Sequence, residues 1–397
     1  MNITDVGHLV SDEDEGDDKL ETGAAREQMT VQEVAEFYIQ AFEKDVEQLN
    51  ILKPNGYRGP HGQYARATDF IKEQLELVKI LIDKGFGYIT EQAIYFDVSK
   101  LKDYGKLTGQ KLADKEVGAR SDVVTDDAKR NPQDFALWFF KVGRFADHSL
   151  SWPSQWGDGF PGWHLECSAI IHATLGEPID IHTGGVDHIG THHTNEIAQT
   201  EAAYDTKLAK YWLHNEHLLV DGHKMAKSTG NFYILKDVID RGYNPLALRL
   251  LYLQSHYRSQ MNFTWDALSA AAAFLKSLQA WADLIHQTEA EIKPEDLGHI
   301  KAAVCDDLNT PAALAGLAEL AGDKAPAKAA LEQLDKLFGL KLADRQDIDQ
   351  PAKDLIKQRE TARQAGDWEK SDELRDKLKQ QGIELNDTPN GSRWHKL

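Results

Sequence analysis

EPIDIHTGGVDHIGTHHTNEIAQTEAAY, residues 177–204, is the stretch that decides the fold. Ile179 and Ile181 alternate with polar residues and lead into two glycines, which is typical of a strand that ends in a tight turn. Residues 192–204 then predict a helix. Strand, glycine turn and helix in this order form the βα unit of an open α/β sheet, where ligands bind at the strand ends. The stretch therefore predicts an α/β domain with a site close to its glycines.

Hydrophobic periodicity predicts the elements on either side of this unit. Apolar residues at helical spacing favour helices over 31–49 and 64–84. Between about 86 and 160, short apolar and aromatic pieces alternate with Gly, Asp and Pro, which indicates small strands in an inserted subdomain.

After about residue 234 the strand signal fades and helices are predicted. Thr310 is expected to cap a helix whose first residue is Pro311. The other expected elements are a helix over 270–285, a charged helical pair over 352–365 and 367–381, and a short irregular end that closes on Arg393 and Trp394.

Composition bounds the class of protein. The chain has 397 residues, 41% of them hydrophobic, which excludes wholesale disorder and suggests more than one domain. We find neither a membrane-spanning run nor a signal segment. With only two cysteines, Cys167 and Cys305, a disulfide framework is excluded and a reducing, cytoplasmic compartment is favoured.

The net charge of −19 argues against non-specific binding of nucleic acid. The charge is uneven, however. Residues 1–50 hold 3 Lys and Arg against 14 Asp and Glu, whereas residues 351–397 hold 10 against 9. An acidic body with a nearly neutral tail can still hold RNA at that tail.

A first candidate site is a metal centre. His192 and Glu196 are four residues apart, so on a helix they share a face and can ligate one ion. Cys167 lies upstream in Trp163-His164-Leu165-Glu166-Cys167, and Cys, His and Glu together are three typical zinc ligands. The alternative from spacing alone is a surface glutamate and a buried, reduced cysteine.

Two further patterns suit a nucleotide. Lys224 and Lys227 lie three apart on the glycine-flanked loop DGHKMAKSTGN, which can close cations over a polyphosphate. Gly185 and Asp187 follow the predicted strand, where a nucleotide can approach the backbone and a carboxylate can accept from ribose. Solvated lysines and a plain turn are the alternatives.

In this order and spacing, the patterns resemble cysteinyl-tRNA synthetases over essentially the whole chain. The matching segments are NITDV (2–6), FPGWHLECSA (160–169), DIHTGGVDH (180–188), HHTNEIAQ (192–199), DGHKMAKSTGNF (221–232), DDLNTP (306–311) and LNDTPNGSRWHKL (385–397).

The resemblance implies an α/β nucleotide-binding catalytic domain, Rossmann-like and of the class I synthetase type, then an all-α helical bundle and a small C-terminal anticodon-binding domain. The expected boundaries are 1–235 for the catalytic domain with an insertion at about 86–160, 236–268 for a stem-contact module, 269–345 for the bundle and 350–397 for the anticodon-binding domain. The implied reaction activates L-cysteine with ATP and Mg²⁺ and esterifies the 3′ end of tRNA(Cys). A cytoplasmic monomer without membrane contact is expected.

The resemblance also assigns roles to residues. It implies one Zn²⁺ per chain, held by Cys167, His192 and Glu196, which also binds the substrate thiolate. Lys227 is implied as the catalytic, ATP-contacting lysine, supported by Lys224. The remaining implied contacts are Trp163 for the amino acid, Gly185 and Asp187 for adenosine, and Arg393 and Trp394 for the anticodon arm.

One family feature is missing from the sequence. The family places a first strand, a further zinc cysteine and an HxGH motif ahead of the segment that matches NITDV, whereas this chain starts at Met1. We therefore expect an N-terminally truncated catalytic domain and a poor enzyme. The alternatives are a non-enzymatic tRNA-binding paralogue or fragment, and a cysteine ligase that acts on an amino sugar.

Overall fold

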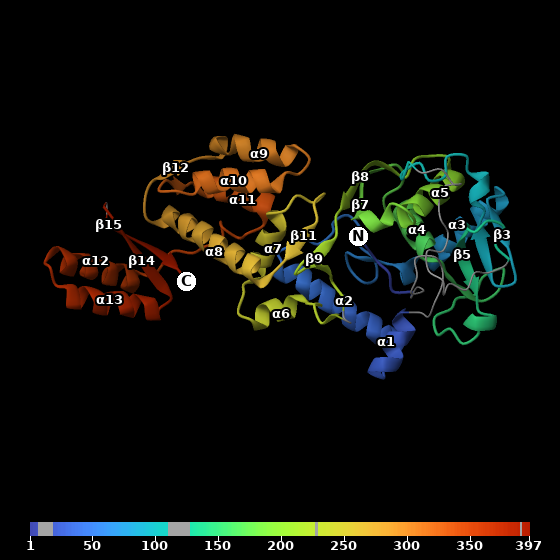
Figure 1. Ribbon diagram of the computed structural model, residues 1–397, viewed down its shortest axis with the longest axis horizontal. Helices are drawn as coiled ribbons and strands as arrows, with labels where there is room; N and C mark the ends of the chain where they lie inside the picture. The colour runs from blue at the N-terminus through green and yellow to red at the C-terminus, as the bar shows by residue number, and fades with distance from the viewer. Residues whose placement is uncertain (7–18, 110–127, 227–228, 390) are drawn as a thin grey trace. The chain divides into compact units, whose positions relative to one another are not determined.

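The computed structural model describes residues 1–6, 19–109, 128–226, 229–389 and 391–397 (Figure 1). The chain divides into two compact units, Met1–Lys44 with Leu52–Asn215, and Asp45–Ile51 with Glu216–Leu397. Within the described ranges, no helix is long and apolar enough to cross a membrane.

The first unit combines parallel strand pairs, an antiparallel sheet and helices. Its strands are β1 (Asn2–Ile3), β2 (Ala65–Arg66), β3 (Gly87–Ile89), β4 (Ala93–Phe96), β5 (Phe135–Phe140), β6 (Gly159–Pro161), β7 (Ile179–Gly185) and β8 (Ala209–Asn215). Its α-helices are α1 (Lys19–Glu27), most of α2 (Val31–Gln48), α3 (Ile71–Asp83), α4 (Trp163–Thr174) and α5 (His192–Tyr204).

The predicted βα unit is confirmed. β7 ends at Gly185, α5 crosses over, and β8 returns parallel to β7 in a register that runs from Ile179↔Ala209 to Gly185↔Asn215. A parallel pair needs such a crossover because a two-residue turn cannot reverse the chain direction twice. The carboxyl ends of both strands therefore meet at one edge, where α5 begins.

The strands expected between 86 and 160 are also confirmed. They form a four-stranded antiparallel sheet in the order β3-β4-β5-β6. All six residues of β5 are buried, because both faces of the sheet are covered. On one face Leu137 packs with residues of α3, α4 and α5, and on the other Phe139 packs with Phe145 and Phe160. This core fixes the positions of α4 and α5.

The second unit is mainly helical. Its strands are β9 (Leu218–Val220), β10 (His223–Lys224), β11 (Met261–Phe263), β12 (Ala290–Ile292), β13 (Ala325–Pro326), β14 (Ile383–Thr388) and β15 (Gly391–Lys396). Its α-helices are α6 (Leu235–Asp240), α7 (Pro245–Leu253), α8 (Trp265–Ala282), α9 (Gly298–Cys305), α10 (Thr310–Leu320), α11 (Lys328–Phe338), α12 (Gln350–Gln364) and α13 (Trp368–Gln380).

Three expectations about this unit need correction. The helix at 310 is capped by Asn309, whose side chain accepts from the backbone of Ala312, so Thr310 is its first residue. The helical bundle is not purely α, because β12 and β13 form a short parallel pair inside it. The strand signal also returns at β11, which pairs with β9.

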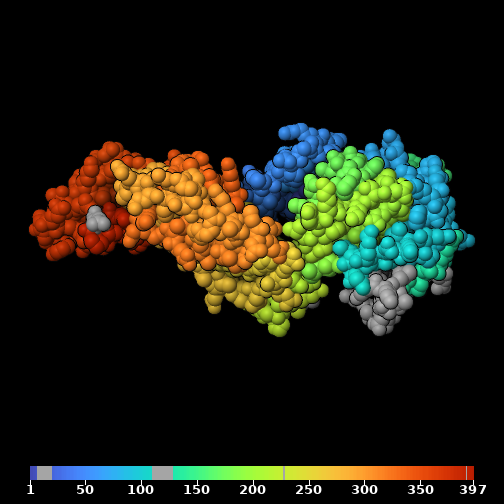
Figure 2. All heavy atoms as spheres, turned by 90° about the horizontal axis from the view of Figure 1, so that it is seen from above, coloured from blue at the N-terminus to red at the C-terminus, as the bar shows by residue number. Residues whose placement is uncertain are grey.

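We expected an irregular end to the chain, and the structure corrects this expectation. The last residues form an antiparallel hairpin. β14 and β15 pair from Ile383↔Lys396 to Thr388↔Gly391. Gly391 has a φ of +116°, which an L side chain rarely adopts, so glycine allows the second strand to start there. The hairpin packs with α12 and α13, and β15 also contacts α8 (Figure 1). In Figure 2 the red residues of this C-terminal part lie directly beside the orange residues of the same unit.

A cluster of arginines holds this C-terminal module together. Arg359 is buried and donates through both terminal nitrogens to the Asp387 carboxylate, at 2.7 and 2.9 Å. Arg363 and Arg375 contact the same carboxylate at 2.5 and 3.1 Å. The hydrogen bonds from Arg359 hold the pKa of Asp387 well below its usual range.

This ion-pair cluster predicts acid sensitivity. A carboxylate with a lowered folded-state pKa stabilises the protein above its unfolded pKa of about 4, and this stability is lost as the pH falls toward the folded value. We expect Asp387→Asn to flatten the fall of melting temperature between about pH 5 and pH 3. Thermal melts across this range check the prediction, with Asp376→Asn, a change at an exposed position of α13, as the control. Equal pH slopes for the two variants would contradict it.

Candidate metal and nucleotide sites

Helix α4 presents Cys167 to the interior of the first unit. It begins after Gly162, where an added Cβ would lie 2.1 Å from the Ala136 carbonyl oxygen of β5. Glycine is therefore needed for the helix to start against the sheet. Residues 164–171 of α4 are all buried, which places Cys167 in the core.

Helix α5 brings the other two predicted ligands to the same place. Its first two turns are buried on every side, which is unusual for a sequence as polar as HHTNEIAQT. Gln199 couples the two helices, because its side-chain nitrogen donates to the His164 carbonyl of α4 at 2.8 Å. Tyr104 donates to Asn195 Oδ1 at 2.6 Å and provides a second side-chain contact that holds α5.

Cys167, His192 and Glu196 form one constellation, as predicted. Their ligand atoms all lie within 4.8 Å of one another. His192 Nε2 and Glu196 Oε1 are 3.5 Å apart. Two ligand atoms around a tetrahedral zinc ion with bonds of about 2.0–2.1 Å lie about 3.4 Å apart. The described residues thus offer three donors at a spacing that suits one ion.

The charges and protonation states of the three side chains favour the binding of a cation. Glu196 Oε1 is buried and has no hydrogen-bond partner within the described residues. Burial, and secondarily the nearby carboxylates Glu196 and Glu166, raise the pKa of the Cys167 thiol well above its ordinary value. Burial lowers the pKa of His192 to about 3, so its imidazole is neutral, the form that binds metal.

Outer contacts orient the donors, and the sequence did not reveal them. His164 and His192 share a hydrogen bond between their Nδ1 atoms at 2.9 Å, which leaves His192 Nε2 toward Glu196. Asn2 donates to Cys167 Sγ at 3.1 Å. Such partners set ring orientation and ligand basicity at metal sites. Only the abundance of histidines between 164 and 223 hinted at this arrangement.

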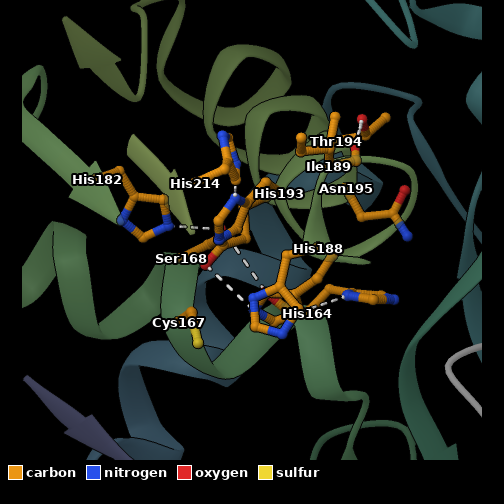
Figure 3. Close-up of polar contacts among 12 residues, drawn as sticks. His164, Cys167, Ser168, His182, His188, Ile189, His193, Thr194, Asn195 and His214 are labelled. Atoms are coloured by element: carbon orange, nitrogen blue, oxygen red, sulfur yellow. Dashed lines mark hydrogen bonds and ion pairs between the residues drawn. The ribbon is translucent and has the colours of Figure 1, made fainter. Parts of the chain in front are cut away.

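More histidines lie in the neighbourhood of Cys167 (Figure 3). His182 of β7 contacts Glu196 Oε2 through its Nε2 at 2.8 Å, and His193 of α5 contacts His214 of β8 at 2.8 Å. Burial lowers the pKa of His193 to about 2 and also lowers that of His214. These side chains belong to β7, β8 and α5. The pairing of β7 with β8 beside α5 is what brings them together.

Trp163, Gly185 and Asp187 lie beside the cluster. The ring of Trp163 stacks on His192 with centroids 4.2 Å apart, which places it as a wall next to the donors. Gly185 is the last residue of β7 and Asp187 is exposed just after it. The neighbouring Gly184 has a role that the sequence did not indicate, since a Cβ there would lie 2.5 Å from His193 Cε1.

The lysine loop lies in the second unit. Lys224 ends β10 and is exposed, while Lys227 lies outside the described residues. Asn231, which sequence reasoning missed, organises the loop by accepting from the Ala226 backbone at 2.9 Å and donating to the Lys224 carbonyl at 3.1 Å. These two hydrogen bonds fix the backbone at Lys224 and Ala226.

Of the two residues predicted to meet the anticodon arm, Trp394 is placed unfavourably for stacking on a base. Trp394 is only 6% exposed and packs with Ile348, Ile356 and Leu385, so its ring belongs to a small core and cannot stack on a base. Arg393 pairs with Asp323 at 2.7 Å. The expectation for Trp394 is corrected, because strand pairing in the hairpin turns this side chain inward. The exposed aromatic residue of this module is Trp368, at 62%.

Comparison with known proteins agrees with these features. Residues 3–273 match the family described as "tRNA synthetases class I (C) catalytic domain", and residues 345–394 match the "Cysteinyl-tRNA ligase anticodon binding domain". The chain is 41% identical to the cysteine–tRNA ligase of Treponema denticola, covering 100% of this chain and 87% of that protein. It is 40% identical to cysteine–tRNA ligase 1 of Burkholderia lata, covering 99% and 83%.

Solved structures support the fold. The methionyl-tRNA synthetase of Mycobacterium tuberculosis bound to methionyl-adenylate is similar with a TM-score of 0.56, covering 86% of this chain and 81% of that one. At 14% sequence identity, this likeness shows a shared class I synthetase fold and nothing about the substrate.

Proposed function

We propose, on the premise that this chain belongs to the cysteine–tRNA ligase family, that it activates L-cysteine with ATP and transfers the cysteinyl group to tRNA(Cys). The observation that carries the proposal is the buried Cys167–His192–Glu196 constellation within a class I catalytic fold. The matched anticodon-binding domain favours tRNA over an amino sugar as the acceptor. Two free cysteines suit a reducing compartment, so we place the reaction in the cytoplasm.

The donor set fits zinc, the metal that the family resemblance implies. Cys167, His192 and Glu196 would hold the ion, with Trp163 as the wall of the amino-acid pocket. A bound zinc ion prefers a soft thiolate to a hydroxyl. This preference matters because cysteine and serine differ in one atom, and an apolar pocket separates such near-isosteres weakly.

The chain's own residues position the reactants. Adenylate formation needs no protein nucleophile, so orientation and charge stabilisation lower the barrier. Gly185, the last residue of β7, and Asp187, just after it, contact adenosine. Lys224 and Lys227 neutralise the charge that develops on the phosphates of ATP. We propose the following domains for this enzyme: a catalytic domain at 1–235 with an insertion at about 86–160, a stem-contact module at 236–268, a helical bundle at 269–345 and an anticodon-binding domain at 350–397.

The test measures cysteinyl transfer directly. Protein loaded with zinc is given ATP, radiolabelled cysteine and either tRNA(Cys) or glucosamine as the acceptor. The proposal expects label in acid-precipitable tRNA and none on the sugar. Transfer to the sugar alone, or equal transfer to the sugar and to tRNA(Cys), would overturn it.

For the anticodon arm we propose a surface of the C-terminal module made by Trp368, Arg363 and Arg375. Trp368 is the exposed first residue of α13, and both arginines are partly exposed around Asp387. An exposed ring can stack on an unpaired base while guanidinium groups meet phosphates or base edges. This surface replaces Trp394 in the role that the sequence predicted.

Trp368→Ala is expected to weaken tRNA(Cys) binding by about 1–3 kcal/mol, roughly 5- to 150-fold, because one stacking platform is lost. Cysteine binding should not change, since that step needs no tRNA. A filter-binding titration of tRNA(Cys) measures the first effect and calorimetry with cysteine the second. Phe37→Ala, which removes an exposed ring of α2, is the control. Unchanged tRNA affinity in the Trp368 variant would place the anticodon arm elsewhere.

A further inference from the structure

The short linker between α9 and α10 has an uncommon backbone. Asp307 and Leu308 both have positive φ, +52° and +54°. Aspartate visits this left-handed region, whereas leucine seldom does. The linker is nevertheless fixed at both ends, because the Leu308 nitrogen donates to the Val304 carbonyl of α9 and Asn309 caps α10. Backbone of this kind persists where the surrounding structure demands it, and it concentrates at functional sites.

The carboxylate of this linker holds a second segment of the chain. Tyr257 donates through its hydroxyl to Asp307 Oδ1 at 2.7 Å, and Arg258 Nε lies 2.8 Å from Asp307 Oδ2. Arg258 also donates to the Tyr257 hydroxyl at 2.9 Å, so the three side chains form a closed set of contacts. The His256 ring stacks on that of Tyr257 with centroids 4.9 Å apart. The linker therefore fixes the turn over residues 256–258.

This turn leads directly into the small sheet that carries the lysine loop. The Tyr257 carbonyl accepts from the Glu216 nitrogen at 2.8 Å, just ahead of β9. A few residues after the turn, β11 begins at Met261 and pairs parallel to β9. The turn is thus joined to the sheet twice, by the chain itself and by a backbone hydrogen bond.

Asn262 of β11 reaches the hairpin on which Lys224 lies. Its Oδ1 accepts from the Gly222 nitrogen at 2.7 Å, and the Phe263 carbonyl accepts from the Asp221 nitrogen at 3.0 Å. Asp221 and Gly222 both have positive φ, as a two-residue type I′ turn between β9 and β10 requires. Lys224 ends β10 directly after this turn. The position of β11 therefore sets the backbone that carries Lys224.

We propose that Asp307 is a positioning residue for Lys224 and acts on it through the Tyr257–Arg258 turn, β11 and Asn262. An exposed ion pair such as that of Arg258 with Asp307 contributes little to stability, so its contribution lies in where it holds β11. Misplacement of a catalytic group by about 1 Å can slow a reaction roughly 100-fold. The inference rests on the proposed function for the action of Lys224 on the phosphates of ATP.

Amide hydrogen exchange tests the structural link without any need for catalysis. Asp307→Asn removes the negative charge while the side chain keeps its size and its tolerance of positive φ. The peptide that contains Gly222 is expected to exchange faster in this variant than in the wild type, because its hydrogen bonds open more often. Asp306→Asn, the same change at the exposed neighbouring residue, should leave this exchange unaltered. Equal exchange in the two variants would overturn the inference.

ATP affinity tests whether the link extends to Lys224. In Asp307→Asn the dissociation constant for ATP, measured by calorimetry, should rise roughly 10-fold, the loss expected when one hydrogen bond to a charged group is misplaced. The dissociation constant for cysteine should not change. Asn262→Ala should cause the same loss, and the double variant should lose no more than either single variant, because both act along one route.

Two further results would overturn the inference. One is an ATP affinity that Asp307→Asn leaves unchanged, and the other is a double variant in which the two losses add. The proposed function fails separately, through transfer of cysteine to the sugar, an assay that these measurements do not involve.

Discussion

Glu196→Gln is expected to strip the constellation of its zinc and to slow cysteine activation by more than about 100-fold. Even outer partners of metal ligands cost about 10- to 100-fold in affinity or activity, and Glu196 is a ligand itself. The amide keeps the volume of the side chain, so the buried packing around α5 is preserved while the anionic donor is lost. Elemental analysis after dialysis measures the metal, and cysteine-dependent ATP–pyrophosphate exchange measures the chemistry relative to the wild type.

The matched control lies on the same helix. Glu201→Gln makes the same substitution on α5, where the native carboxylate pairs with Lys106 on the surface. This variant should keep its zinc and its activity. If Glu196→Gln held as much zinc as Glu201→Gln, the metal would be bound elsewhere and the assignment of the three ligands would be wrong.

Arg345→Met is expected to destabilise the second unit by about 3–5 kcal/mol, because it leaves a buried carboxylate without its counter-charge. Asp283 is fully buried and receives two hydrogen bonds from Arg345. The backbone nitrogen of Lys396 also donates to Asp283, and Arg345 donates to the Lys396 carbonyl, so this pair fastens β15 to the bundle.

Urea unfolding of the whole chain, followed by tryptophan fluorescence, measures the loss. Arg258→Met is the comparison, because Arg258 pairs with Asp307 at an exposed place where ion pairs contribute about 0–1 kcal/mol. The double variant Asp283→Asn with Arg345→Met should recover part of the stability, since the uncompensated charge is gone. If Arg345→Met and Arg258→Met were equally stable, the buried pair would not hold the module in place.

Local patterns were sufficient to predict the elements that build the candidate site. The strand over 179–185 and the helix over 192–204 follow from alternation and helical spacing, and the spacing of His192 and Glu196 places both on one helix face. The contributions of His182, His214 and Asn2 could not be predicted in this way. They come from three strands, and only the register of β7 on β8 and the pairing of β1 with β2 bring them near α4 and α5.

The C-terminal hairpin shows the opposite failure, where breaker residues misled. Gly382, Pro389 and Gly391 were interpreted as breaks that leave an irregular end, whereas Gly382 precedes β14, Pro389 follows it and Gly391 begins β15. The pairing of Leu385 with Trp394 completes a small core that a single chain segment does not reveal. Deleting residues 385–397 would remove this core, and point variants such as Trp368→Ala are therefore the sharper test of tRNA binding.

The most direct measurement of the central claim is the absorption spectrum of the Co²⁺-substituted protein during a titration with cysteine. If Cys167, His192 and Glu196 hold an ion that selects the substrate by its sulfur, a sulfur-to-cobalt charge-transfer band should grow as cysteine binds. Serine at the same concentrations should leave the spectrum unchanged. Absence of any change with cysteine, or equal changes with cysteine and serine, would contradict the account.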